Sequence, residues 1–315
     1  MDYKKYLKSL LSVVVVALFV VFFYKEFKEN WESFRTFHLQ INWGYIVLGI
    51  LMMIANYLCA TLSWHIGINC FDNQKKLKFT QSIALVNIPQ LGKYIPGKLW
   101  SYVFQIYWLA SKGFPKTTIL YLNVITTALI ILVSLIMGCL FLMILPDWYH
   151  YKTEIIIFVI LLLILNLILI NNNFLKYFIG IISKIAKKEI SFNQLSSGRI
   201  ISMQFFYIIG AFFWILAGCF ITLGIGFGLE ELKIIFIAAA MLLGDVIGFI
   251  ILVAPGGLGV REGTIFLILK GTGIIQYALI FPIVLRLLNI VTDLIMGAVS
   301  VLIMSSSRYF PRNNE

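Results

Sequence analysis

The sequence contains few charged residues, few cysteines and few histidines. Of its 315 residues only 12% are Asp, Glu, Lys or Arg, and there are four cysteines and three histidines. The cysteines form no C-x-x-C pair and no histidine has a partner at ligand spacing, so we expect no metal and no other cofactor. The G-x-S-x-G motif, the Walker loop, the H-E-x-x-H motif and the EF-hand loop are absent as well. These absences argue against the common classes of hydrolase, nucleotidase and metalloenzyme.

Long apolar runs dominate the sequence. Hydrophobic residues make up 61% of it, and the mean hydropathy is +0.95. An apolar run of about 18 residues or more is long enough to cross a membrane as a helix. The pattern predicts an all-α, polytopic membrane protein with about eight apolar segments. Six of them are expected to be long transmembrane helices, over residues 7–24, 43–66, 117–145, 154–171, 200–227 and 275–304.

Two further apolar segments, 80–111 and 233–270, are interrupted by Pro-Gly. The first break reads Lys93-Tyr94-Ile95-Pro96-Gly97-Lys98-Leu99-Trp100, and the second reads Ala254-Pro255-Gly256-Gly257-Leu258-Gly259-Val260-Arg261-Glu262-Gly263. Proline and glycine disfavour a continuous helix. Non-helical backbone at membrane depth occurs where it is buried in protein or lines a cavity. Each segment is therefore predicted to be a re-entrant hairpin or a pair of short helices.

The basic residues predict the orientation of these segments. The net charge is +11, and most Lys and Arg residues lie near the two ends of the chain and in the connections 67–78, 112–116 and 172–199. Positively charged connections stay in the cytoplasm, which places both termini there in a multi-pass protein of the plasma (inner) membrane. Basic cytoplasmic connections are enough to explain the positive net charge, so we expect no nucleic-acid partner.

We expect one transmembrane domain over residues 1–315, built from two related halves, 1–171 and 200–315. The amphipathic segment 172–199 joins them as a cytoplasmic linker. Each half contains a helix, a segment broken at Pro-Gly and a long helix, and the predicted orientation makes the two breaks enter from opposite sides. Such halves are inverted repeats, which recur in secondary transporters. The alternative is that Pro-Gly recurs by chance.

A helix begins after each break, and its first backbone N–H groups have no partner within the helix. Together with the helix dipole they favour an anion such as a lipid phosphate. Lys93 and Lys98 flank the first break and Arg261 follows the second, which adds positive charge. Two alternatives stay open: Lys93 and Lys98 extend to the membrane interface, or Arg261 and Glu262 form a structural ion pair that fixes the hairpin.

Further polar residues lie in the apolar segments around the second break. Asp245 precedes it, and Arg286, Asn289 and Asp293 recur at i, i+3 and i+7, which places them on one helix face. Charges at membrane depth face the protein interior, so we expect a buried network that neutralises itself or relays protons. The candidate substrate-binding residues are Lys93, Tyr94, Pro96, Gly97, Lys98, Trp100, Asp245, Pro255, Gly256, Gly257, Gly259, Arg261, Glu262, Arg286, Asn289 and Asp293.

The two breaks, together with Leu285-Arg286-Leu287-Leu288, resemble the lysylphosphatidylglycerol synthase transmembrane-region family, also called flippase-like domain proteins. The resemblance covers nearly the whole chain. It implies a flippase-like helical bundle with re-entrant segments that moves a lipid or a lipid-linked sugar across the membrane. Two-domain members also have a cytosolic domain that transfers lysine from its tRNA to phosphatidylglycerol. This sequence shows no such domain, so the resemblance does not extend aminoacyl transfer to it.

Two departures from the family pattern argue against identical roles for the halves. The first break continues Lys98-Leu99-Trp100-Ser101, where an acidic-basic pair is common in relatives. The first half also has no Arg that matches Arg286.

We therefore expect a flippase-like protein that translocates an anionic phospholipid or a lipid-linked saccharide. The lipid is its expected partner, with a separate enzyme of lipid or glycan synthesis as a second one. One alternative is a lipid-modifying transferase of the phosphatidylglycerol lysyltransferase type that acts with a separate catalytic partner and uses Asp245 or Glu262 as a base. The other is a small-solute or ion transporter in which Asp245, Glu262 and Asp293 bind a cation.

Overall fold

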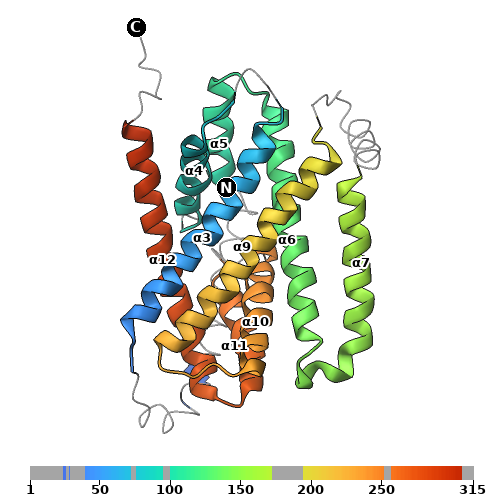
Figure 1. Cartoon of the computed structure of the whole chain (residues 1–315), viewed down its shortest axis with the longest axis vertical. Coiled ribbons are helices and arrows are strands. Elements are labelled where there is room, and N and C mark those ends of the chain that lie inside the picture. Colours follow the sequence, from blue (N-terminus) through green and yellow to red (C-terminus); the bar gives the residue numbers. More distant parts are fainter. Residues whose placement is uncertain are drawn as a thin grey trace, which may run out of the picture.

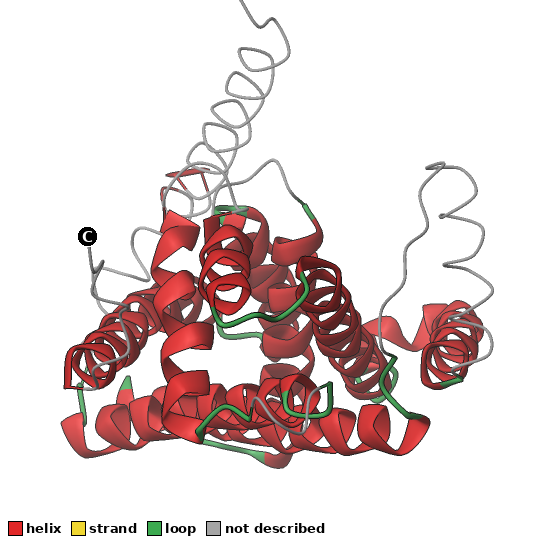
Figure 2. Ribbon diagram, turned by 90° about the horizontal axis from the view of Figure 1, so that it is seen from above, coloured by secondary structure: helices red, strands yellow, loops and turns green. Residues whose placement is uncertain are grey.

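The computed structural model describes residues 24–25, 28, 40–71, 76–94, 100–171, 194–251 and 257–306. All regular structure in these residues is helical, which confirms the all-α prediction (Figures 1 and 2). The elements in chain order are α3 (Trp43–Ile68), α4 (Phe79–Asn87), η1 (Ile88–Tyr94), α5 (Trp100–Ser111), α6 (Lys116–Leu142), η2 (Pro146–Tyr151), α7 (Lys152–Ile170), α9 (Ser197–Gly224), α10 (Glu231–Ile250), α11 (Val260–Leu269), η4 (Lys270–Thr272) and α12 (Ile275–Ser306).

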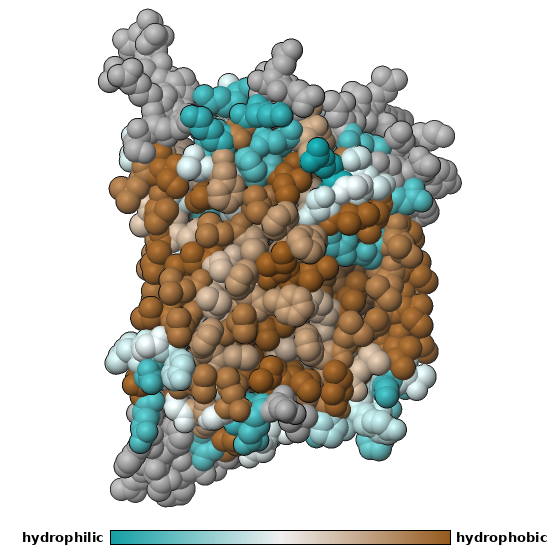
Figure 3. Space-filling model, in the orientation of Figure 1, coloured by the Kyte–Doolittle hydropathy of each residue, from teal (hydrophilic) through white to brown (hydrophobic). Residues whose placement is uncertain are grey.

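Six helices in the described part of the chain are long and apolar enough to cross a membrane. They span Trp43–Ile68, Lys116–Leu142, Pro146–Ile170, Ser197–Gly224, Lys233–Ile250 and Ile275–Ser305. On the face shown in Figure 3, apolar residues cover the middle of the molecule and hydrophilic residues gather at its two ends. This arrangement is that of a membrane-embedded bundle.

Two of the expected segments differ from the structure or lie outside it. The predicted helix over 7–24 lies outside the described residues, as does almost all of the linker 172–199. The sixth helix that is long and apolar enough to cross is instead α10, which belongs to the second broken segment. With 20 residues it is about 30 Å long. The sequence placed the break correctly, but the arm before it is a full-length helix.

Helices α3 and α9 lie side by side along most of their length at the centre of the bundle and run antiparallel (Figure 1). Glycines allow the approach: a Cβ atom at Gly49 would lie 3.0 Å from Ile221 Cγ1, and one at Gly224 would lie 2.6 Å from Ile46 Cδ1. Small residues let helix backbones come close in a membrane, where packing rather than water drives association. The α3–α9 pair therefore forms the axis on which the other helices assemble.

The helices of each broken segment pack against a long helix from the other half of the chain. Helix α4 packs against α12, and α10 packs against α6. Glycines lie at these contacts: Gly297 of α12 faces Leu91 of η1, which directly follows α4, and Gly138 of α6 faces Leu243 of α10. Each broken segment thus packs against the long helix that follows the other one.

We predict that Gly224→Leu destabilises the protein and that Gly198→Leu does not. A side chain at position 224 meets Ile46, including its backbone nitrogen at 3.2 Å, whereas nothing lies within 4 Å of a Cβ atom at position 198. Overpacking of this kind costs about 1–3 kcal/mol. Unfolding of both variants in detergent measures the difference. Equal stability of the two would contradict the close α3–α9 packing.

Candidate functional site

Helices α10 and α11 form a tight antiparallel hairpin around the second break. A Cβ atom at Gly244 would lie 2.5 Å from Ile265 Cγ1, and one at Gly248 would lie 2.8 Å from Arg261 Cβ. Residue numbers rise along α10 as those of their neighbours fall along α11, so the two helices run in opposite directions. The absence of side chains at Gly244 and Gly248 lets α11 lie directly on α10.

Two glycines shape the turn that enters α11. Gly257 has φ +72° and Gly259, the residue before the helix, has φ +88°. Both values are in the left-handed region that favours glycine. A Cβ atom at Gly257 would also lie 2.8 Å from the carbonyl oxygen of Gly248. These two candidates from the sequence therefore have a structural role, since they allow the chain to reverse.

Glu262 closes the N-terminus of α11. Its Oε2 accepts a hydrogen bond of 2.8 Å from the backbone N–H of Gly259, and its Oε1 accepts one from Arg286 Nη1 on α12. Only 3% of the residue is exposed. A carboxylate is stabilised by the helix N-terminus and by the guanidinium. The carboxylate of Glu262 thus lies at the helix N-terminus where the sequence predicted a bound anion.

Arg261 has a different partner from its neighbour in sequence. Its Nε donates to Asp245 Oδ1 of α10 at 2.7 Å, and its guanidinium carbon lies 5.6 Å from the centre of the Trp214 ring on α9. Arg261 and Glu262 therefore belong to two separate ion pairs. The pair with Asp245 fixes the hairpin, and the pair with Arg286 joins it to α12.

Asp293 extends the group of charges toward α3. Tyr57 donates a hydrogen bond of 2.7 Å to Asp293 Oδ1. Asp293 and Asn289 are 1% and 5% exposed, which confirms that the polar face of α12 points into the bundle. We call these residues the central cluster: Tyr57, Trp214, Asp245, Arg261, Glu262, Arg286, Asn289 and Asp293.

The central cluster lies at half depth. Tyr57, Trp214 and Asp293 are each close to the middle of α3, α9 and α12. These three residues are therefore far from both ends of α3, α9 and α12, where polar groups would reach water or headgroups. Tyr57 and Trp214 were missed by the sequence reasoning. Their positions in the sequence could have identified them. Tyr and Trp are typical of the membrane interface, and in the middle of a membrane helix their polar atoms need a hydrogen-bond partner.

The remaining candidates lie at the two breaks and are not placed in full. The backbone of Lys93 and Tyr94 lies in η1 and that of Trp100 begins α5, without a description of their side chains. Residues 95–99 and 252–256 lie outside the described residues, and they include Pro96, Gly97, Lys98, Pro255 and Gly256. Whether the two breaks act together stays a prediction.

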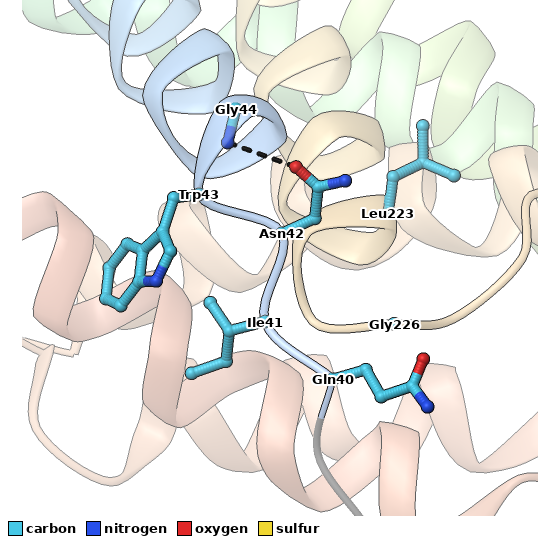
Figure 4. Close-up of a pocket in the computed structure, with 7 residues that line it drawn as sticks. All are labelled: Gln40, Ile41, Asn42, Trp43, Gly44, Leu223 and Gly226. Carbon is cyan, nitrogen blue, oxygen red and sulfur yellow. Dashed lines mark hydrogen bonds between the residues drawn. The ribbon is translucent and has the colours of Figure 1, made fainter.

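A shallow pocket near the start of α3 is separate from the cluster (Figure 4). It is lined by residues 40–44 with Leu223 and Gly226, none of which is charged. The Asn42 side-chain oxygen accepts from the backbone N–H of Gly44, and the backbone N–H of Asn42 donates to Gly224 O at 2.8 Å. The pocket belongs to a helix cap at the end of the bundle. The described residues also contain no group of three or more His, Cys, Asp or Glu that could hold a metal.

Comparison with known proteins places this architecture in a family. The model of the family described as "Lysylphosphatidylglycerol synthase TM region" matches residues 9–297, which is most of the chain. No curated protein and no solved structure matches the chain.

Removing one partner of the Arg286–Glu262 pair is expected to lower the free energy of unfolding more than removing both partners. Arg286→Ala leaves a buried carboxylate without its cation, which costs about 3–5 kcal/mol. The double variant with Glu262→Ala removes both charges and should regain most of the loss. Free energies of unfolding for the two single variants and the double variant form the test. Strictly additive effects would show that the two side chains do not interact.

Proposed function

Because the chain belongs to the family of the lysylphosphatidylglycerol synthase TM region, we propose that this multi-pass membrane protein moves a phosphate-bearing lipid between the two leaflets. The lipid is an anionic phospholipid or a lipid-linked saccharide, handled in the plasma membrane alongside a separate enzyme of lipid or glycan synthesis. The observation that carries the proposal is the central cluster, which places five charged side chains on a glycine-packed hairpin and its neighbouring helix at half depth.

The cost of these charges supports a transport role. Each ionisable side chain inside the hydrocarbon region is expensive, and such residues usually mark a substrate or ion pathway. A lipid headgroup meets the same barrier when it changes leaflet. A polar interior lowers that barrier for the headgroup, while the apolar exterior of the bundle keeps the acyl tails in lipid (Figure 3).

The packing supports an inverted repeat with alternating access. The antiparallel α3–α9 pair and the exchange of α4 and α10 between the long helices α12 and α6 are what a two-fold axis in the membrane plane requires. Helix α10 begins and α11 ends near the same end of the molecule (Figure 1), which supports a re-entrant hairpin. Rocking of the halves would expose the cluster to each side in turn, with both termini in the cytoplasm.

The two alternative functions receive less support from the same contacts. Asp245 and Glu262 each accept a hydrogen bond from a guanidinium group. These oxygens are already occupied, which makes the two carboxylates poor ligands for a transported cation and poor bases for a transferase.

In proteoliposomes, the wild-type protein is expected to move headgroup-labelled phosphatidylglycerol between leaflets, and Arg261→Ala to slow the movement about tenfold. The variant removes charge-assisted hydrogen bonds worth about 1.5–3 kcal/mol. Leu267→Ala is the matched control, because Leu267 lies on the same helix with its side chain 61% exposed. Accessibility of the label to a membrane-impermeant quencher gives the rate. A rate equal to that of protein-free vesicles, or an unchanged rate in Arg261→Ala, would contradict the proposal.

Cells that lack the protein should still make the lipid but keep it in one leaflet. Translocation and synthesis are separate steps, so total lipid extracts of cells with and without the protein should match while surface labelling differs. Loss of a lipid species from the total extract would instead favour the transferase.

A further inference from the structure

Three buried hydrogen-bond donors in the central cluster have no acceptor among the described residues. They are Arg261 Nη2, Trp214 Nε1 and Asn289 Nδ2. Trp214 and Asn289 are each 5% exposed, so bulk water does not reach them freely. A buried donor without a partner costs about 1–3 kcal/mol, and more when it is charged. Such a cost in one place is typical of a site that a ligand completes.

The three donors come from different helices of one cluster. The guanidinium of Arg261, on α11, lies over the Trp214 ring of α9 at 5.6 Å. Asn289 lies on α12 between Arg286, which binds the residue after Arg261, and Asp293, which binds Tyr57. Helix α12 packs against both α9 and α11. The three donors thus come from three helices that pack together.

The chemistry of the central cluster is one-sided. The carboxylate oxygens of the cluster already accept hydrogen bonds at Asp245 Oδ1, at both oxygens of Glu262 and at Asp293 Oδ1. The groups left without a partner are all donors, and one of them belongs to a cation. A phosphodiester has acceptor oxygens only and a negative charge, so it complements this set, whereas an ammonium group does not.

We infer that Arg261, Trp214 and Asn289 bind the phosphate oxygens of the transported lipid, with Trp214 acting both as an N–H donor and as the surface on which the guanidinium rests. The inference rests on the proposed function and assigns its substrate contact. Arginine suits the task because its planar fork can bind an oxyanion and stack on an aromatic ring at the same time. Asp245 positions this arginine through its Nε, and the Glu262–Arg286 pair holds the start of α11 against α12.

Binding of three probes to the purified full-length chain tests the inference. Native mass spectrometry in detergent compares dioleoyl phosphatidylglycerol, dioleoylglycerol and inorganic phosphate. Trp214→Phe keeps the ring under Arg261 and removes only the N–H donor. Its affinity for phosphatidylglycerol should fall about tenfold, the effect of one hydrogen bond to a charged group. Asn289→Leu should cause a similar loss, and dioleoylglycerol should bind weakly to every form.

Trp64→Phe is the matched control for Trp214→Phe. Trp64 is equally buried, but its Nε1 already donates to Asn123 Oδ1 at 3.3 Å within the protein. Its affinity for phosphatidylglycerol should equal that of the wild type. Melting temperatures of all variants show whether each one is folded, and Asn289→Leu provides a second reading if Trp214→Phe does not fold.

Several outcomes overturn the inference: equal binding of dioleoylglycerol and phosphatidylglycerol, wild-type affinity in folded Trp214→Phe and Asn289→Leu, or an equal loss in Trp64→Phe. Tight binding of inorganic phosphate, weakened by Trp214→Phe, would support the three donors and identify free phosphate rather than a headgroup as the source. If Trp214→Phe weakens phosphatidylglycerol binding but the wild-type protein moves no lipid in vesicles, the binding site stands and the proposed function fails.

Discussion

Burial of charge inside an apolar bundle is the constraint on which the rest of this structure depends. A guanidinium or carboxylate at half depth is stable only when the protein supplies both an opposite charge and hydrogen bonds. The ion pairs and hydrogen bonds of the central cluster join different elements: Arg261–Asp245 joins α11 to α10, Glu262–Arg286 joins α11 to α12, and Tyr57–Asp293 joins α3 to α12. The charges therefore hold together the helices that surround them.

Glycine makes this arrangement feasible. The guanidinium of Arg261 reaches Asp245 because Gly248 has no side chain where the two helices touch, and the chain can turn back because Gly257 and Gly259 adopt positive φ. The same device brings α3 and α9 together at Gly49 and Gly224. Large apolar residues also cover the outside, where Leu267, Leu287 and Leu294 are exposed. Close packing inside and apolar bulk outside thus separate a polar interior from the surrounding lipid.

The fold class and much of the cluster could be predicted from the sequence, because hydropathy and helical spacing are local properties. The spacing of Arg286, Asn289 and Asp293 was sufficient to place them on one buried face. The pairing was not predictable, since adjacent residues on a helix point about 100° apart and Arg261 and Glu262 meet partners on different helices. Tyr57 and Trp214 were missed because hydropathy does not report where the polar atom of an aromatic side chain lies. Only the tertiary contacts show that each residue belongs to the cluster.

The way Arg261 is paired bears on how a charged ligand enters without destabilising the bundle. A phosphate that had to displace Asp245 from the arginine would break the ion pair that holds α11 on α10. Here Nε carries the contact with Asp245, while Nη2 has no partner in the described structure. A guanidinium has five N–H donors in a fixed plane, so one edge keeps the hairpin closed while the other receives an oxyanion. One side chain can therefore both stabilise the hairpin and bind the ligand. The ligand accepts hydrogen bonds from donors that have no other partner, and the ion pair between Arg261 and Asp245 stays intact.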